Sequence, residues 1–95
     1  MNVNEKHASD KGVSAQSLFK GETGAVIALQ ILKGEMLAEH ITKIPAMLLC
    51  INGEVVFNNE KGIELALKAG DYVDIEPLVK HWVKGVEDSQ LVLMK

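Results

Sequence analysis

The sequence predicts a single all-β domain folded as a small antiparallel β-barrel. Short apolar runs follow one another from Val13 onward, and Gly, Asn or Pro separates them about every eight to twelve residues, as in sandwiches and barrels. Several of these runs alternate apolar and polar side chains, with the period of two that a half-buried strand requires. A chain of 95 residues is long enough for one hydrophobic core.

Two regions are expected along the chain. Residues 1–12 are polar and show no periodicity, which predicts a flexible N-terminal arm. Residues 13–95 are expected to form the barrel domain. Its predicted strands are Ser14–Phe19, Ala25–Leu32, Ala38–Thr42, Ala46–Ile51, Glu54–Phe57, Ile63–Leu67, Tyr72–Ile75, His81–Val86 and Leu91–Met94.

Propensity alone leaves the segment Ile63–Ala69 open, because it is rich in good helix formers. However, Ile63, Leu65 and Leu67 occupy alternate positions, and glycines bound the segment, so the period favours a strand. Asn52-Gly53, between two apolar runs, predicts a tight hairpin turn.

Charge and cysteine content exclude several classes of partner. The net charge is -3 and all ten basic residues are lysine, so the chain lacks both the basic surface and the guanidinium groups typical of nucleic-acid binding. The single cysteine, Cys50, cannot form an intrachain disulfide. No signal peptide or membrane-spanning stretch is expected, which together with the lone thiol predicts a cytoplasmic protein.

The predicted strand Ala46–Ile51 and the stretch Val26–Leu29 with its continuation, within the predicted strand Ala25–Leu32, are apolar on both faces, so both faces should be covered. A second copy of the chain is the favoured cover, which predicts a homodimer; the N-terminal strand folding over that face is the alternative. Trp82, together with the outward residues of Ala46–Ile51, is expected at the interface.

The spacing of glycines and histidines resembles the cupin superfamily from Val13 to the C-terminus. Gly34–Ala46, which contains His40 and is followed by Asn52-Gly53, resembles the first cupin motif, and Gly70–Pro77, running on to His81, resembles the second. The resemblance implies a double-stranded β-helix, or jelly roll, of the RmlC-like type.

In that family, two histidines and a glutamate of the first motif and one histidine of the second hold a divalent metal. His40 and His81 match the first and last of these ligands, whereas Thr42 and Ala46 stand where the second histidine and the glutamate are expected. The resemblance therefore implies a degenerate site that holds no metal or binds Fe, Mn, Ni or Zn weakly. Strand alternation directs Glu39 away from His40, and Glu76 lies where a strand ends, so neither supplies an obvious third ligand.

Alternation also predicts the lining of a lumen. If His40 points inward, the side chains expected beside it are those of His81, Thr42, Leu48, Cys50 and Val83, with Gln30 as an unusual polar residue in an apolar strand. Taken singly, either histidine could instead be a core imidazole bonded to a backbone carbonyl. Cys50 is expected to be an inert core thiol.

These observations favour a barrel that binds a small organic molecule without catalysing a reaction, and no catalytic residue is assigned. The first alternative is a metal-dependent cupin dioxygenase or isomerase that uses His40 and His81. A second alternative is an epimerase-like cupin in which a histidine acts as a general base without metal. The lack of arginine counts against this epimerase, because nucleotide phosphates are usually held by such residues.

Overall fold

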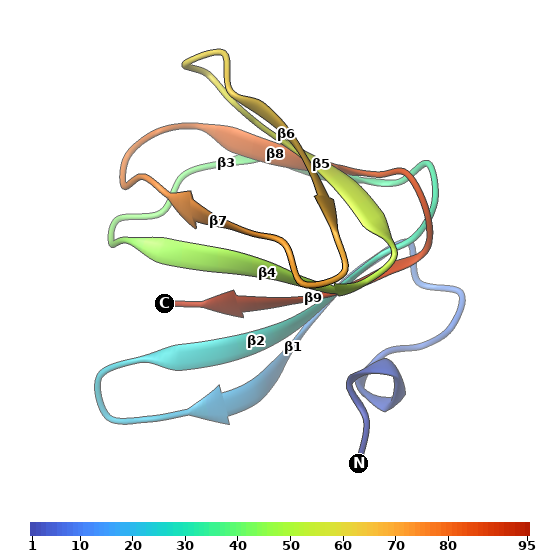
Figure 1. Ribbon diagram of the computed structural model, residues 1–95. Coiled ribbons are helices and arrows are strands. Elements are labelled where there is room, and N and C mark those ends of the chain that lie inside the picture. The colour runs from blue at the N-terminus through green and yellow to red at the C-terminus, as the bar shows by residue number, and fades with distance from the viewer.

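In the computed structural model, which describes residues 1–95, two antiparallel sheets face each other and enclose the core (Figure 1). One sheet has five strands in the order β1-β2-β9-β4-β7, and the other has four in the order β3-β8-β5-β6. The all-β prediction is confirmed. The strands are β1 (Val13–Lys20), β2 (Ala25–Ile31), β3 (Met36–His40), β4 (Ala46–Asn52), β5 (Glu54–Asn59), β6 (Glu64–Lys68), β7 (Tyr72–Ile75), β8 (His81–Gly85) and β9 (Ser89–Met94).

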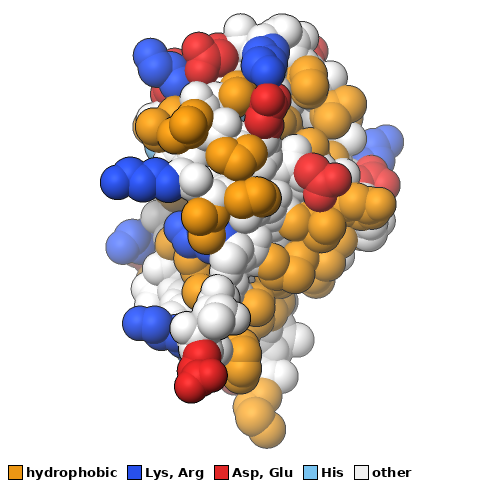
Figure 2. Space-filling model, turned by 90° about the vertical axis from the view of Figure 1, so that its left-hand side faces the viewer, with side chains coloured by type: hydrophobic (Ala, Val, Ile, Leu, Met, Phe, Trp, Pro, Cys, Tyr) orange, Lys and Arg blue, Asp and Glu red, His pale blue; other side chains and the backbone are white.

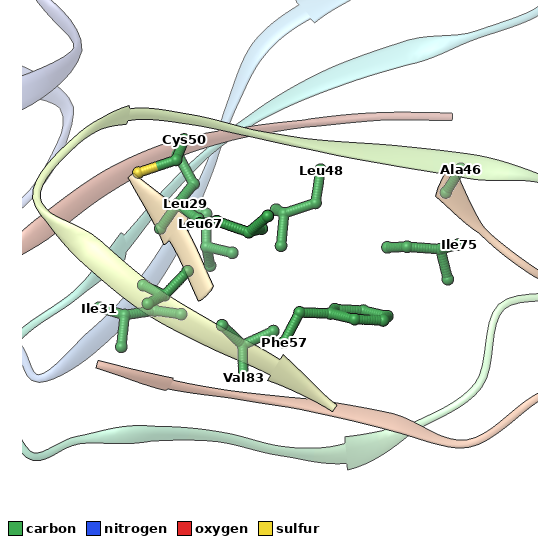
Figure 3. Close-up of a cluster of buried hydrophobic side chains, with 11 residues drawn as sticks. Leu29, Ile31, Ala46, Leu48, Cys50, Phe57, Leu67, Ile75 and Val83 are labelled. Atoms are coloured by element: carbon green, nitrogen blue, oxygen red, sulfur yellow. The ribbon is translucent and has the colours of Figure 1, made fainter. Parts of the chain in front are cut away.

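Aliphatic side chains from both sheets fill the space between the sheets, and Phe57 is the one aromatic residue of this cluster (Figure 3). Alternation places every second residue of β4 in this core, as expected for a pleated strand. The core cluster consists of Leu29, Ile31, Ala46, Leu48, Cys50, Val55, Phe57, Leu67, Ile75, Val83 and Leu91. The barrel interior is therefore packed through its middle.

Two local predictions about turns and strands are confirmed. The segment after Gly62 forms strand β6 and pairs with β5, so the period of two outweighs its helix propensity. Asn52-Gly53 joins β4 to β5, and Gly53 has a φ of +88°. A side chain at Gly53 would also collide with Asp88 and Ser89, so only glycine fits this turn.

Strand β3 differs from the predicted strand Ala38–Thr42, because it begins at Met36 and ends at His40. Its pairing with β8 shifts register between Leu37 and His40, which marks a β-bulge. The bulge lets Leu37 and His40 face the same side although they are three positions apart. Thr42 lies beyond the strand, where its backbone carbonyl accepts a hydrogen bond from the Leu78 amide at 2.8 Å.

The N-terminal arm lies against the outer face of the five-stranded sheet. It contains a short 3-10 helix, Val3–Lys6, and then turns past β2 into β1. The side-chain amide of Gln30 donates to the carbonyls of Ala8 and Lys11, both at 2.9 Å, and Gln90 donates to the Gln30 carbonyl at 2.8 Å. The arm thus satisfies a glutamine that the sheet buries on its outer side.

Beyond the arm, the outer face of this sheet is apolar. Its aligned rows are Phe19, Val26, Met94, Met47 and Asp74, and then Gln16, Ala28, Val92, Leu49 and Tyr72, so its polar members lie at the edge strands β1 and β7. Trp82 lies on the opposite side of the molecule, since it alternates with the inward His81 and Val83 in the other sheet. The prediction that Trp82 and the outward residues of β4 share one surface is therefore wrong, because they belong to different sheets. The structure contains no helix with the length and apolar character needed to cross a bilayer.

The contacts of Gln30 predict how firmly the arm is held. Replacing Gln30 with Ala removes three hydrogen bonds and leaves the Gln90 amide without its acceptor. The free energy needed to detach the arm from the sheet should therefore fall by more than about 1.4 kcal/mol. We expect trypsin to cut after Lys11 at least about tenfold faster in Gln30→Ala, followed by mass spectrometry. Gln16→Ala, a change on the neighbouring strand, is the control and should leave the rate unchanged. Equal rates in the two variants would contradict the role given to Gln30.

Candidate functional site

His40 and His81 are direct partners across β3 and β8, and both face the barrel interior. Their ring centroids are 4.1 Å apart with an interplanar angle of 60°, an edge-to-face contact. His81 is buried and also stacks on Phe57 at 5.8 Å, whereas His40 is partly exposed. The two histidines that the sequence singles out are thus brought together, with His81 beneath His40.

Backbone carbonyls fix the protonation of both rings. Nδ1 of His40 lies 2.9 Å from the Ala38 carbonyl, and Nδ1 of His81 lies 3.2 Å from the Val79 carbonyl. A carbonyl only accepts, so each Nδ1 carries the proton and each Nε2 of a neutral ring is left as an acceptor. The two interpretations of these histidines are therefore compatible: the rings lie next to each other, and each ring is also hydrogen-bonded to a backbone carbonyl.

The surroundings of His81 favour its neutral form. Burial lowers the pKa of His81, and the nearby His40 adds to this effect, while the hydrogen bond to the Val79 carbonyl opposes it. Neutral His81 packs beneath His40, and its Nδ1 proton is already donated to the Val79 carbonyl.

An open pocket of about 500 Å³ lies beside His40 at the end of the barrel that carries the β1–β2 turn, the β3–β4 loop and the C-terminus. Thr42 and Leu93 contribute to its inner wall, and the Oγ1 atom of the buried Thr42 has no hydrogen-bond partner. Figure 2 shows this end of the molecule. The lining residues are Lys20, Gly21, Glu22, Thr23, Gly24, Ala25, His40, Ile41, Thr42, Lys43, Ile44, Leu93 and Lys95.

Five of the seven residues predicted to line a lumen do not line this pocket. One of them is His81, which lies beneath His40. Leu48, Cys50 and Val83 point inward as expected, but they pack in the closed core and line no pocket (Figure 3). Gln30 faces the outer side of its sheet, so its prediction as a lumen residue is wrong. Leu29 and Ile31 point into the core from β2. Gln30 lies between them in the strand, so its side chain points outward and contacts the N-terminal arm.

The Cys50 side chain is fully buried, as expected of a core thiol. Burial raises the pKa of Cys50, and the carboxylates of Asp71 and Glu54 raise it further. A thiol that resists ionisation is a poor nucleophile, so Cys50 offers no covalent chemistry to the pocket.

The donor set around His40 and His81 does not fit a three-ligand metal centre. No group of three His, Cys, Asp or Glu side chains is placed to hold an ion. Glu39 and Glu76 are directed to the surface, where they pair with Lys80 at 3.7 Å and Lys61 at 2.8 Å. Two imidazoles and a threonine hydroxyl remain, which is fewer strong ligands than such centres usually have.

Lysines at the mouth of the pocket are the residues that sequence reasoning missed. Lys20 precedes the turn Gly21–Gly24, Lys43 lies in the β3–β4 loop, and Lys95 follows β9. These positions are far apart in the sequence, and only the closure of the barrel brings them together. The glycine-bounded turn was the available signal that a loop lies there, but it carries no information about what the loop faces.

The pKa of His81 predicts how stability depends on pH. Burial lowers the pKa in the folded chain below the unfolded value of about 6.5, and burial also lowers the pKa of His7, aided by Lys6. As the pH falls below about 6.5, the unfolded chain takes up protons that the folded chain resists, so the free energy of unfolding should fall by up to about 1.4 kcal/mol per pH unit for each imidazole.

Urea unfolding between pH 7.5 and pH 5.5, roughly one unit on either side of the unfolded value, measures this loss. His81→Gln should remove one part of the slope and His7→Gln the other. A free energy of unfolding that is constant or rises toward low pH would contradict the assignment.

No family model and no curated protein matches this chain. Solved structures do match it. A cupin superfamily protein from Desulfitobacterium hafniense superposes with a TM-score of 0.86 at 15% identity, over 98% of this chain and 84% of that one. A conserved protein with a double-stranded β-helix domain from Klebsiella pneumoniae gives a TM-score of 0.84 at 22% identity, over 99% and 85%.

An RmlC-like cupin from Shewanella frigidimarina gives a TM-score of 0.80 at 21% identity, over 92% of this chain and 78% of that one. Identities this low establish the fold and leave the activity open. The facing sheets, their strand order and these superpositions agree with the resemblance found in the two sequence motifs. The chain therefore has the cupin fold, a double-stranded β-helix with His40 at its open end.

Proposed function

We propose that the protein binds a small organic molecule in the pocket at the open end of the barrel, without catalysing a reaction. The observation that carries this proposal is Thr42, a buried residue on the pocket wall whose hydroxyl has no partner in the protein. A buried hydroxyl without a hydrogen bond costs about 1–3 kcal/mol. The oxygen is enclosed in the free protein, so a polar group of a ligand would remove that cost only after the Thr42 side chain turns toward the pocket. His40 Nε2 offers a second polar contact nearby.

The pocket also has the composition of a ligand site. Ala25, Ile41, Ile44 and Leu93 give it an apolar part, and the other lining side chains are polar or charged. Such a mixture suits a molecule with an apolar body and a small number of hydrogen-bonding groups. The core behind His81 is closed, so a ligand would occupy the mouth and leave the middle of the barrel untouched.

The available side chains favour binding over catalysis. Cys50 is inaccessible, and His81 lies beneath His40 with its pKa lowered by burial. His40 is the remaining candidate for a general base, and its Nδ1 contacts the Ala38 carbonyl instead of a carboxylate that would stabilise its charged form. The unpaired thiol of Cys50 is also in keeping with a reducing compartment, so the proposal places the protein in the cytoplasm.

A metal-dependent enzyme is the second candidate, and one observation favours it. Both histidines hold their Nδ1 protons on carbonyls and leave Nε2 free, the arrangement that orients imidazoles toward a metal. Elemental analysis of untagged protein distinguishes the candidates. Metal near one ion per chain that the His40→Ala/His81→Ala variant loses would favour the enzyme.

The unpartnered hydroxyl predicts a conflict between stability and binding at Thr42. In Thr42→Val, a methyl group replaces the hydroxyl without leaving a cavity, so the free energy of unfolding should rise by about 1 kcal/mol. Binding of pocket ligands should weaken about tenfold at the same time. Thr23→Val, a change at an exposed position of the same pocket, is the control for stability.

Chemical denaturation measures the first effect. Amide chemical shifts of His40, Thr42 and Leu93 measure the second, during titration with benzoate, benzamide and nicotinamide. Destabilisation by Thr42→Val would show that the hydroxyl has a partner in the free protein, and the proposal would lose its main support.

We further propose that two copies of the chain pair through the outer face of the five-stranded sheet. The aligned rows on this face contain one charged residue, Asp74 at the β7 edge. Phe19 and Tyr72 are 64% and 60% exposed there, although they flank residues as buried as Val92. An apolar surface nearly free of charge has the composition of an interface core. The arm covers the Gln30 end of the face, where Ala28 and Val92 are also buried, and Phe19 and Tyr72 at the edges of the rows remain exposed.

The pairing predicts which substitutions separate the copies. Sedimentation of the wild type should give the mass of two chains, and Phe19→Glu/Tyr72→Glu should give the mass of one, because it would bury four carboxylates in the contact. Both side chains are largely exposed, so the variant should remain folded. Trp82→Gln, on the other sheet, should still form the dimer. A monomeric wild type, or a dimer that only Trp82→Gln disrupts, would contradict the proposal.

A further inference from the structure

Three lysine side chains surround the pocket mouth without acidic partners. Lys20, Lys43 and Lys95 line the pocket, and none has a carboxylate oxygen within 4.0 Å. Lys61 and Lys80, by contrast, pair with Glu76 and Glu39. The ammonium groups at the mouth therefore form no ion pair in the protein, and Glu22 in the same lining offsets part of their charge.

The sign of charge at the mouth is opposite to that of the whole chain. The protein has 13 acidic and 10 basic residues, so a random sample of its surface would be negative. Glu22 is the single acidic side chain among the lining residues, against three lysines. Figure 2 shows several lysine side chains along one side of this end of the molecule, beside a band of hydrophobic side chains. Such a local excess attracts anions into the pocket.

We propose that the ligand of this pocket is a small organic carboxylate; this rests on the proposed binding function. Its charged end would lie among the lysine ammonium groups, and the Thr42 hydroxyl, which is enclosed in the free protein, would donate to it after turning toward the pocket. Its apolar body would contact Leu93 and Ile44. Lysines act on an anion as point charges and accept many carboxylate geometries.

A carboxylate fits these groups better than a phosphate does. Phosphate sites usually add arginine or a cradle of backbone amides to lysine, and this chain has no arginine. In the β1–β2 turn, the Gly21 amide already donates to the Gly24 carbonyl at 2.8 Å and the Ala25 amide to the Lys95 carbonyl at 2.6 Å. These two amides are therefore not available to a phosphate, whereas the Glu22, Thr23 and Gly24 amides of the turn donate to no backbone acceptor, so the preference rests on the lack of arginine.

Calorimetric titration of the full chain with matched probes tests the inference. Benzoate should bind at least about tenfold more tightly than benzamide, its neutral analogue, and more tightly than phenyl phosphate. The Lys20→Gln/Lys43→Gln variant should weaken benzoate binding about tenfold in low salt and leave benzamide binding unchanged. Glu22→Gln should strengthen benzoate binding. Lys84→Gln, outside the pocket, is the matched control and should change nothing.

Each other outcome overturns a stated part of the proposal. Equal binding of benzoate and benzamide would overturn the anion preference and leave the binding function in place. Tighter binding of phenyl phosphate would replace the carboxylate with a phosphate. If no probe shifts the amides of Thr42 and Leu93, both the inference and the proposed function fail.

Discussion

The β-bulge in β3 is the constraint on which the candidate site depends. Regular alternation from the inward Leu37 would place Glu39 inside the barrel and His40 outside it. The extra residue reverses this order, so that His40 pairs with His81 on the inner face and Glu39 reaches Lys80 at the surface. A carboxylate buried beside His81 would carry a desolvation cost that the bulge avoids.

Burial of His81 then decides how deep a ligand can enter. Its ring lies between His40 and Phe57, and the aliphatic core continues behind it toward Leu48 and Cys50. None of the core residues lines the pocket, and Leu93, which packs against the core, is the lining residue that joins the two. A closed core stabilises so small a domain, and under the proposed function it would confine a ligand to the mouth, where loop residues would determine the chemistry of binding.

The strands, the facing sheets and the histidine pair could be predicted from the sequence, because period, turn residues and motif spacing are local signals. Gln30 could not be placed, since its partners are carbonyls of the N-terminal arm about twenty residues earlier. The end of β3 was predicted two residues beyond its actual position, at Thr42 instead of His40, because a bulge leaves no reliable mark in the sequence. The lysines of the mouth escaped for a related reason: Lys20, Lys43 and Lys95 meet only through the tertiary fold.

The lysines can be compared with Thr42 and Ala46, the two positions at which the resemblance to cupins implies metal ligands that this chain lacks. Ala46 packs in the core beside Ile75, so a carboxylate at that position would be buried without a partner. Under the proposal, a positive mouth would repel a divalent cation and attract an anion, so it would weaken any metal binding at His40 and His81 and favour a carboxylate. The alanine at position 46 and the lysines of the mouth would act in the same direction. Under the proposal, a site that resembles a metal centre in its histidines would bind an anion directly, with lysine ammonium groups supplying the positive charge that a metal ion would otherwise provide.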